Sequence, residues 1–315
     1  WVVSDVVRGV TKNLATDTSA AEDDATRTTQ YVAGGIKVGN SNFSNKDGSK
    51  TIGYFLKAGG SASTIAEDSV SSGIPSLDSS VSAADHGGFS VGTFTAESGT
   101  MKIGHGLSRK PDFIWVKNRG ASGQWWIFHR SIGHGKYLVL GATGESAEAS
   151  STDVWANTDP DSNTFSTNST WLGTSGNYSF MALAKTPGLI ATGSYVGNGV
   201  SAGPYVVVDD GASGFLPAFV MFKNTNASQS WEIHDIGREP YNITPGGTFA
   251  GRLQPDTNSA ESTTFILQKH ANGFRIVTGG ASANGSGNTF VYIAFAENPF
   301  GGDGVAQAKA LAKAL

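Results

Sequence analysis

The chain has 315 residues, of which 15% are charged, with 42 glycines, no cysteine and a formal net charge of −4 at pH 7. Ordinary globular domains are about 25% charged, so this composition excludes a coiled coil and charged disorder, and the lack of any basic run argues against nucleic acid as a partner. Without cysteine there are no disulfides, cysteine-ligated zinc sites or thiol catalysis, and no apolar run approaches the roughly 18 residues of a membrane span. The glycine content favours turn-rich β structure in two or three modules.

The first segment, residues 1–60, is predicted to be the back half of a β module. Trp1–Asp5 matches two later segments that begin at Trp125 and Trp231, and an apolar strand is predicted at Thr51–Leu56 after a glycine turn. Because the chain opens on tryptophan instead of methionine, we expect it to be a fragment or a processed product.

Residues 61–87 are rich in Ser, Ala and Asp, with scattered aliphatic side chains. This composition predicts an extended connector that carries one short strand at most.

Two complete copies of the repeat follow, at 88–190 and 191–302. The equivalent segments, first copy and then second, are Gly88–Thr95 and Thr192–Gly199, Lys110–Asn118 and Leu216–Asn224, Ala121–His129 and Ala227–Asp235, and Ser175–Ala184 and Ser286–Ala296. Within them, short runs alternate with period two and are bounded by Gly, Pro or Asn. The fold class predicted is therefore all-β, with tandem antiparallel β-sandwich modules of jelly-roll type.

The last segment, residues 303–315, is the one predicted helix. It is rich in Ala, Lys and Leu, has no helix breaker from Val305 onward, and places Leu311 and Leu315 on one face. A helix of this length is marginal unless it docks on something.

Few residues point to chemistry, and the sequence predicts neither catalytic residues nor a cofactor or metal. The six histidines have no zinc-binding helical spacing and fit strand or turn positions; they are His86, His105, His129, His134, His234 and His270. Gly199–Gly203 matches a serine-hydrolase elbow on paper, but Pro204 and a β-branched run follow instead of a helix. The Asp-rich segments Asp159–Asn163 and Asp209–Gly211 suit turns better than a calcium site.

Tryptophan supplies the candidate binding and core residues. Trp1, Trp125 and Trp231 recur at equivalent places and are predicted to pack in the repeat core. Trp155 and Trp171 do not recur and lie in polar surroundings, so they are the candidates for an exposed platform that stacks on a glycan or receptor.

The repeat resembles a tandem β-repeat domain family of virion structural proteins from tailed phages and prophages, notably marine and cyanobacterial phages. The segments that carry the resemblance are Gly88–Ser90, Gly104–Leu107, Lys110–Lys117, Trp125–Ser131, the terminal strand Tyr292–Phe300 and the joint Leu56–Gly60. The third copy departs from the pattern because it lacks the Gly-His-Gly-Leu turn, and the first copy lacks its front half. The resemblance implies a structural or adhesive part of a virion, with no catalytic residues.

These observations lead to one expected function and two alternatives. We expect a non-enzymatic tail fibre or appendage component that attaches to a host-surface glycan or protein. It would bind other virion proteins and form a homo-oligomer, with a trimer as the first hypothesis. A capsid decoration protein is the first alternative, and a tailspike-type glycan-degrading enzyme, which needs two carboxylates across a groove, is the second.

Overall fold

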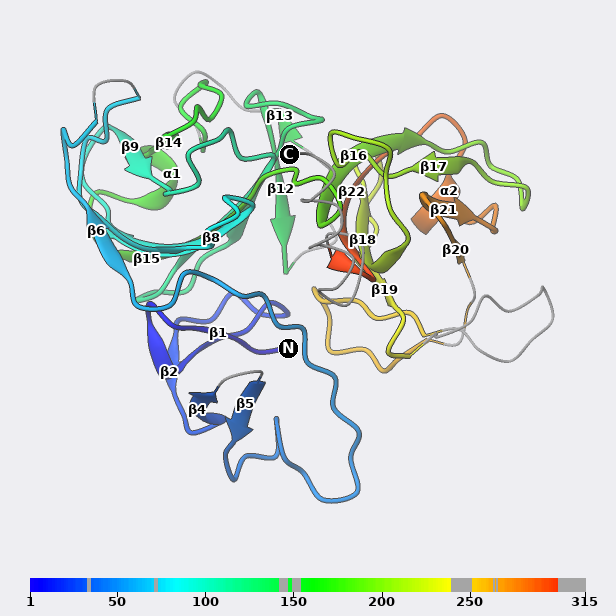
Figure 1. Ribbon diagram of the computed structural model, residues 1–315, viewed down its shortest axis with the longest axis horizontal. Helices are drawn as coiled ribbons and strands as arrows, with labels where there is room; N and C mark the ends of the chain where they lie inside the picture. The colour runs from blue at the N-terminus through cyan, green and yellow to red at the C-terminus, as the bar shows by residue number, and fades with distance from the viewer. Residues whose placement is uncertain are drawn as a thin grey trace, which may run out of the picture. The chain divides into compact units, whose positions relative to one another are not determined.

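The computed structural model describes residues 1–32, 35–70, 73–141, 147–148, 154–238, 251–262, 264 and 266–299. Within them the predicted all-β class is confirmed, since the ladders between named strands are antiparallel and the two helices have four residues each (Figure 1). The chain divides into two compact units. Unit 1 comprises Trp1–Phe128, Gly133–Gly141 and Ala147–Leu183; unit 2 comprises His129–Ile132 and the described residues from Ala184 onward.

The N-terminal segment of unit 1 forms a small sheet and a hairpin. Its strands are β1 (Val3–Asp5), β2 (Gly9–Leu14), β3 (Asp23–Asp24), β4 (Thr28–Val32) and β5 (Gly35–Val38). The sheet has the order β1-β2-β3, and β4 pairs with β5. The strand predicted at Thr51–Leu56 is not formed, because these residues belong to none of the sheets that the described residues build.

The rest of unit 1 is a β-sandwich. Its strands are β6 (Ser63–Ile65), β7 (Ser79–Ala83), β8 (Phe89–Thr95), β9 (Thr100–Gly104), β10 (Phe113–Asn118), β11 (Trp125–His129), β12 (Lys136–Leu140), β13 (Ala147–Glu148), β14 (Thr164–Asn168) and β15 (Asn177–Leu183), with the helix α1 (Ser169–Leu172). The large sheet has the order β13-β12-β11-β10-β15-β8-β7-β6, and the small sheet pairs β14 with β9. Figure 1 shows the long strands β8 and β15 running together through this unit.

The segment 61–87 is more ordered than predicted. It holds two strands, β6 and β7, and β7 extends the large sheet by pairing with β8 from Ser79↔Phe94 to Ala83↔Ser90. The prediction of at most one short strand is therefore wrong. Serine can occupy buried strand positions here because its hydroxyl finds an acceptor, as when Ser79 Oγ donates to Gly104 O at 2.8 Å.

Aromatic side chains from both sheets fill the core of unit 1. Phe94 of β8 stacks on Tyr178 of β15 at 5.4 Å between ring centroids, and Phe165 of β14 meets Phe180 of β15 edge-on at 5.2 Å. All four side chains are at least 96% buried. Offset and edge-on pairs of this kind add about 0.5–1.5 kcal/mol each beyond the burial of their apolar area.

Unit 2 repeats the same plan. Its elements are β16 (Ile190–Val196), β17 (Tyr205–Val207), β18 (Pro217–Asn224), β19 (Glu232–Asp235), β20 (Leu267–His270), β21 (Gly273–Ile276), α2 (Ala281–Asn284) and β22 (Thr289–Ala296). One sheet has the order β16-β22-β18-β19 and the other β17-β21-β20. Their facing side chains form a single core, in which Tyr195 and Phe290 of the first sheet pack with Phe274 of the second.

One glycine per module fixes how the central strand packs. Gly92 of β8 pairs with Phe180, and Gly193 of β16 pairs with Tyr292. A Cβ at Gly92 would lie 2.4 Å from the Phe180 ring, and one at Gly193 would lie 2.6 Å from Tyr292 Oη. The aromatic side chain of the neighbouring strand therefore occupies the space that a side chain at the glycine would need.

The predicted helical tail, residues 303–315, lies outside the described residues.

Candidate functional site

Two partly exposed aromatic residues lie on the outer part of the large sheet of unit 1. Strands β11 and β12 pair with Trp126 opposite Val139 and Ile127 opposite Leu138. Because side chains alternate along a strand, Trp125, Ile127 and Leu138 are buried while Trp126 and Tyr137 remain partly exposed. Their rings meet edge-on at 5.1 Å between centroids.

The helix α1 brings a third aromatic ring to the same place. Asn168 caps its N-terminus by accepting a hydrogen bond from the Thr170 amide at 2.8 Å, and Gly173 ends it with φ of 91°. Leu172 points into the core, whereas its neighbour Trp171 is 41% exposed. The Trp171 ring lies 5.4 Å from that of Trp126 and 5.8 Å from that of Tyr137.

Trp126, Tyr137 and Trp171 form what we call the aromatic cluster. Each ring contacts the other two, with Trp126 edge-on to both neighbours and Tyr137 tilted against Trp171, so the rings support one another before any ligand arrives. A rigid, partly exposed group of rings loses little conformational entropy on binding and offers apolar faces with a polar indole N–H and phenol O–H. This chemistry suits the apolar face of a sugar ring or an aromatic or aliphatic side chain of a protein.

Of the two residues predicted to form an exposed platform, Trp171 is exposed and Trp155 is buried. Trp171 belongs to the aromatic cluster. Trp155 is only 1% exposed and meets Phe128 edge-on at 5.6 Å, so it is a core residue and cannot form part of a platform. The turn after it, with positive φ at Ala156 and Asn157, returns the chain so that Trp155 faces inward although its sequence neighbours are polar. Trp126 and Tyr137 were not among the predicted platform residues: Trp126 lies beside Trp125 in a repeated strand segment, and no motif or repeat marks Tyr137.

Two of the three tryptophans predicted for the repeat core are fully buried. Trp125 and Trp231 are each 1% exposed, and Trp125 contacts Trp115 at 4.6 Å between centroids. Its indole Nε1 donates to Ala15 O at 3.1 Å, which ties the N-terminal segment to the sandwich of unit 1. Trp1 is only partly buried.

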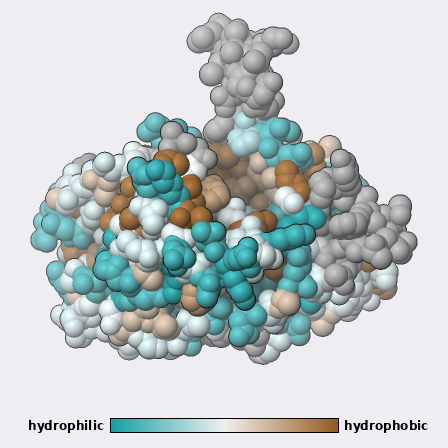
Figure 2. All heavy atoms as spheres, turned by 90° about the horizontal axis from the view of Figure 1, so that it is seen from below, coloured by the Kyte–Doolittle hydropathy of each residue, from teal (hydrophilic) through white to brown (hydrophobic). Residues whose placement is uncertain are grey.

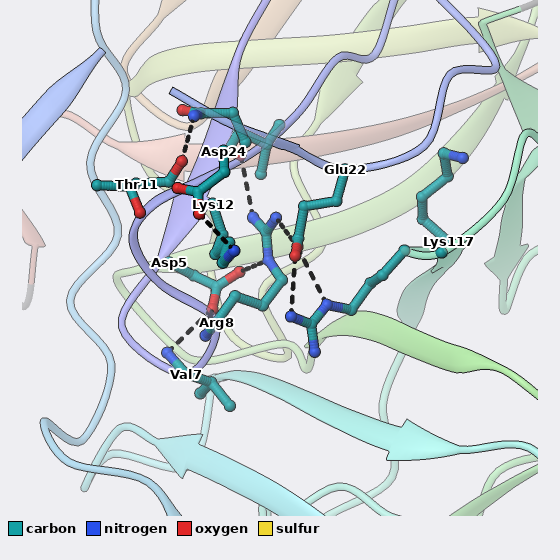
Figure 3. A network of polar contacts seen from close by, with 12 residues as sticks. Asp5, Val7, Arg8, Thr11, Lys12, Glu22, Asp24 and Lys117 are labelled. Carbon is teal, nitrogen blue, oxygen red and sulfur yellow. Dashed lines mark hydrogen bonds and ion pairs between the residues drawn. The ribbon is translucent and has the colours of Figure 1, made fainter. Parts of the chain in front are cut away.

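A charged network joins the strands of the N-terminal segment (Figure 3). The buried Arg8 guanidinium donates through Nε to Asp5 and through Nη1 to Glu22 at 3.0 Å. Arg119 binds the same Glu22 carboxylate through Nε at 3.0 Å and Nη2 at 2.9 Å. Burial raises the pKa of Glu22, but the hydrogen bonds from Arg119 and Arg8 outweigh it, and the pKa lies below its usual value.

Unit 2 contains the same network. Arg238 donates through Nε to Asp235 at 2.7 Å and through Nη1 to Glu261 at 2.7 Å. The spacing Trp-x-x-x-Asp-x-x-Arg begins at Trp1 and again at Trp231, so the amino-acid sequence itself contains a motif for this network, although the motif was not among the predictions. The middle copy has His129 and Ile132 at these positions, and the network is thus specific to two of the three copies.

Two buried carboxylates form the second electrostatic feature of unit 2. Burial raises the pKa of Glu232 to about 7, with Arg252 and Gln254 acting in the opposite direction, and burial raises the pKa of Asp256 to about 6. Glu232 is 0% exposed and Asp256 6%, and Asp256 Oδ2 accepts from the Trp231 amide at 3.1 Å. Such carboxylates resemble acid–base catalysts in pKa, but a substrate has no access to a side chain buried to this degree.

The remaining candidate motifs lie in turns. Asp161 Oδ1 accepts from the amides of Asn163 and Thr164, and Asp210 Oδ1 accepts from those of Ala212 and Gly214. Gly199–Gly203 joins β16 to β17, so the strand-to-helix context of a hydrolase elbow is missing. In the described part of the chain no three His, Asp or Glu side chains are grouped to hold a metal ion.

The described surface is of mixed character. Figure 2 shows a face on which hydrophilic and weakly polar residues predominate and hydrophobic ones form separate patches. Of the two helices among the described residues, neither has the length or the apolar composition to cross a membrane.

Comparison with known proteins identifies one family. The family described as Domain of unknown function (DUF7483) matches residues 1–299. No curated protein and no solved structure matches the chain.

Proposed function

We propose that this chain, which belongs to the family of domains of unknown function DUF7483, is a non-enzymatic structural protein of a bacteriophage virion that attaches the particle to its host. It serves as part of a tail fibre or similar appendage and works as a homo-oligomer. The observation that carries the proposal is the aromatic cluster, three mutually packed rings on a β-sandwich with Trp171 41% exposed. The resemblance of the repeat to phage virion proteins supports the viral setting.

The ligand that best suits the aromatic cluster is a glycan of the host surface. The rings lie in fixed positions on a strand pair and a capped helical turn, so binding requires little ordering of the protein. Sugar rings present C–H groups that pack on aromatic faces, while their hydroxyls stay hydrated or bind nearby polar groups. The low charge of the chain suits a neutral ligand of this kind.

Binding is tested with the purified chain on host cells and on an array of host glycans. We expect Trp171→Ala to weaken binding at least about tenfold, which corresponds to about 1.4 kcal/mol, and Trp171→Phe to retain part of it. The matched control is Tyr205→Ala, which removes a 48% exposed aromatic side chain from unit 2 and should bind like the wild type. Equal binding by Trp171→Ala and the wild type would contradict the proposal.

Location in the particle is tested by immunogold labelling of intact virions with antibody to this chain. Gold on the tail or its fibres supports an adhesive appendage. Gold spread over the head favours the alternative role, a capsid decoration protein whose contacts are with other virion proteins.

A further inference from the structure

Short polar side chains form a row across the face of the large sheet that points away from the core of unit 1. Phe94 points into the core, so its neighbours in β8, Thr93 and Thr95, point outward. The antiparallel register sets one polar residue of each strand directly opposite the next, in the order Thr64, Ser80, Thr93, Ser179 and Lys117. This polar row therefore crosses β6, β7, β8, β15 and β10 in turn.

A pocket of about 230 Å³ opens on this face, and its lining includes Ser80 and Thr93 of the polar row. Asp78, Thr95 and Asn177 line it as well, and the protein holds two of these in place. Thr95 Oγ1 donates to Asn177 Oδ1 at 3.1 Å, which leaves the Nδ2 donors of that amide for a ligand. Asp78 Oδ1 accepts from the backbone amide of the residue that follows Ala66, at 2.9 Å, which leaves Oδ2 as an acceptor.

The charges around the pocket favour a neutral ligand. The two charged side chains of its lining, Asp78 and Arg119, have opposite signs. Arg119 also binds the Glu22 carboxylate through Nε and Nη2, so its charge is already compensated and Nη1 remains as a donor. Because hydroxyl, amide and carboxylate groups line the same pocket, the lining both donates and accepts hydrogen bonds. A ligand rich in hydroxyl groups, each of which is a donor and an acceptor, matches this set.

The size of the pocket sets the size of the ligand. Pockets for drug-sized molecules measure about 300–1,000 Å³, and this one is smaller. A single sugar ring with its hydroxyls is a ligand of this size, so a longer glycan would place one of its sugars here.

Unit 2 shows that the fold does not require these polar side chains. Its equivalent row is Ser194, Val291 and Lys223, which stand opposite one another as Thr93, Ser179 and Lys117 do. Val291 thus fills a fully buried position with an apolar side chain. In unit 1 Ser179 is equally buried, and its Oγ has no hydrogen-bond partner in the described part of the chain. A buried hydroxyl without a partner costs free energy, so stability alone favours the valine, and the polar row of unit 1 points to another role.

We propose that this pocket binds a single uncharged sugar residue through its hydroxyl groups, at a site separate from the aromatic cluster. Asp78 Oδ2 accepts from the hydroxyls of the ligand, and Asn177 Nδ2 and Arg119 Nη1 donate to them. The hydroxyls of the polar row take either role by rotation. The site goes beyond the proposed function, since none of its residues belongs to the aromatic cluster and its ligand need not be the glycan that the cluster contacts.

The experiment is a titration of the isotope-labelled full chain, followed by NMR. The probes are the methyl glycosides of glucose, galactose, mannose and N-acetylglucosamine, each added up to about 50 mM, with methyl glucuronide as the charged counterpart. We expect at least one neutral glycoside to shift the backbone amide of Thr93 and the side-chain amide of Asn177, with a dissociation constant of about 1–10 mM. The absence of such shifts with every neutral glycoside would overturn the proposal, as would tighter binding of the glucuronide. The indole N–H signals of Trp126 and Trp171 report on the aromatic cluster in the same spectra, so the two sites succeed or fail separately.

The variant Thr93→Val/Thr95→Val removes hydroxyls from the lining and keeps β-branched side chains, which suit a strand. Valine fits the second position, because Val196 holds the equivalent place in β16 of unit 2. We expect this variant to bind the glycoside at least about fivefold more weakly, because each hydroxyl contributes a hydrogen bond. The matched control is Ser194→Val, which makes the same change on the equivalent row of unit 2 and should bind like the wild type. Equal affinity of the three proteins for the glycoside would count against the site.

Discussion

The two buried carboxylates of unit 2 make its stability depend on pH in a definite direction. The pKa of Glu232 rises from an ordinary value of 4.5 to about 7 on folding, chiefly because the side chain is removed from water. The folded state therefore holds its proton more tightly than the unfolded state, and the free energy of unfolding falls as pH rises from 4.5 to 7. At about 1.4 kcal/mol per pKa unit, the loss is on the order of 3 kcal/mol.

The substitution Glu232→Gln tests this reasoning, because glutamine keeps the size of the side chain and cannot ionise. Between pH 4 and pH 8 the wild type should lose on the order of 3 kcal/mol more of unfolding free energy than the variant. Asp256, whose pKa is also raised, contributes a loss of the same sign in both proteins, and the other titrating groups, whatever their sign, are also common to both. Their contributions cancel in the comparison.

The assay is a urea titration with pulsed hydrogen exchange, read by mass spectrometry on peptides of unit 2. Peptides of unit 1 from the same samples are the internal control and should have the same midpoints in both proteins at each pH. Equal losses of stability in the wild type and in Glu232→Gln would refute the argument that burial of this carboxyl opposes its ionisation.

Two further substitutions probe the packing of the units by the same titration. Arg8→Ala should destabilise unit 1 by about 3 kcal/mol, because it leaves the partly buried Asp5 carboxylate without its cation and removes one of the two that bind Glu22. Lys12→Ala, which breaks an ion pair at the surface, should change little, and equal losses would contradict the first expectation. Gly193→Ala should destabilise unit 2 by about 1–3 kcal/mol, because the new methyl would overlap the Tyr292 side chain. Gly135→Ala is its control: a Cβ at Gly135 would have no atom within 4 Å, so the free energy of unfolding of unit 1 should stay unchanged.

The sequence predicted the fold class well, because the all-β class depends on local patterns. The short apolar run at Phe113–Asn118 forms the strand β10, and the recurrence of Trp125 and Trp231 marks equivalent buried positions. The sequence did not predict features that depend on contacts between residues far apart in the chain. The pattern of Thr51–Leu56 suits a strand, but a strand also needs a neighbour to pair with, and this segment joins none of the sheets among the described residues.

The candidate site was predicted only in part for a similar reason. Trp155 and Trp171 have comparable polar surroundings in sequence, and only the path of the chain buries one and exposes the other. Trp126 and Tyr137 join Trp171 through contacts across 34 or more residues, which no spacing rule reports. By contrast, the Asp–Arg spacing after Trp1 and Trp231 can be recognised from the sequence alone, because the whole motif lies within eight residues.

The strands β6 and β7 have a consequence for how such repeats can be joined. In unit 1 they continue the large sheet beyond β8, whereas in unit 2 the equivalent strand β16 is the last of its sheet among the described residues, and its Val196 is 58% exposed. The outward backbone groups of an edge strand can in general pair with a further strand. A long segment between copies thus supplies further strands that cover the edge of the first strand of the repeat, and a short one leaves that strand at the edge. The length of the joining segment, more than the sequence of the repeat, would then set whether neighbouring copies stay separate or assemble side by side.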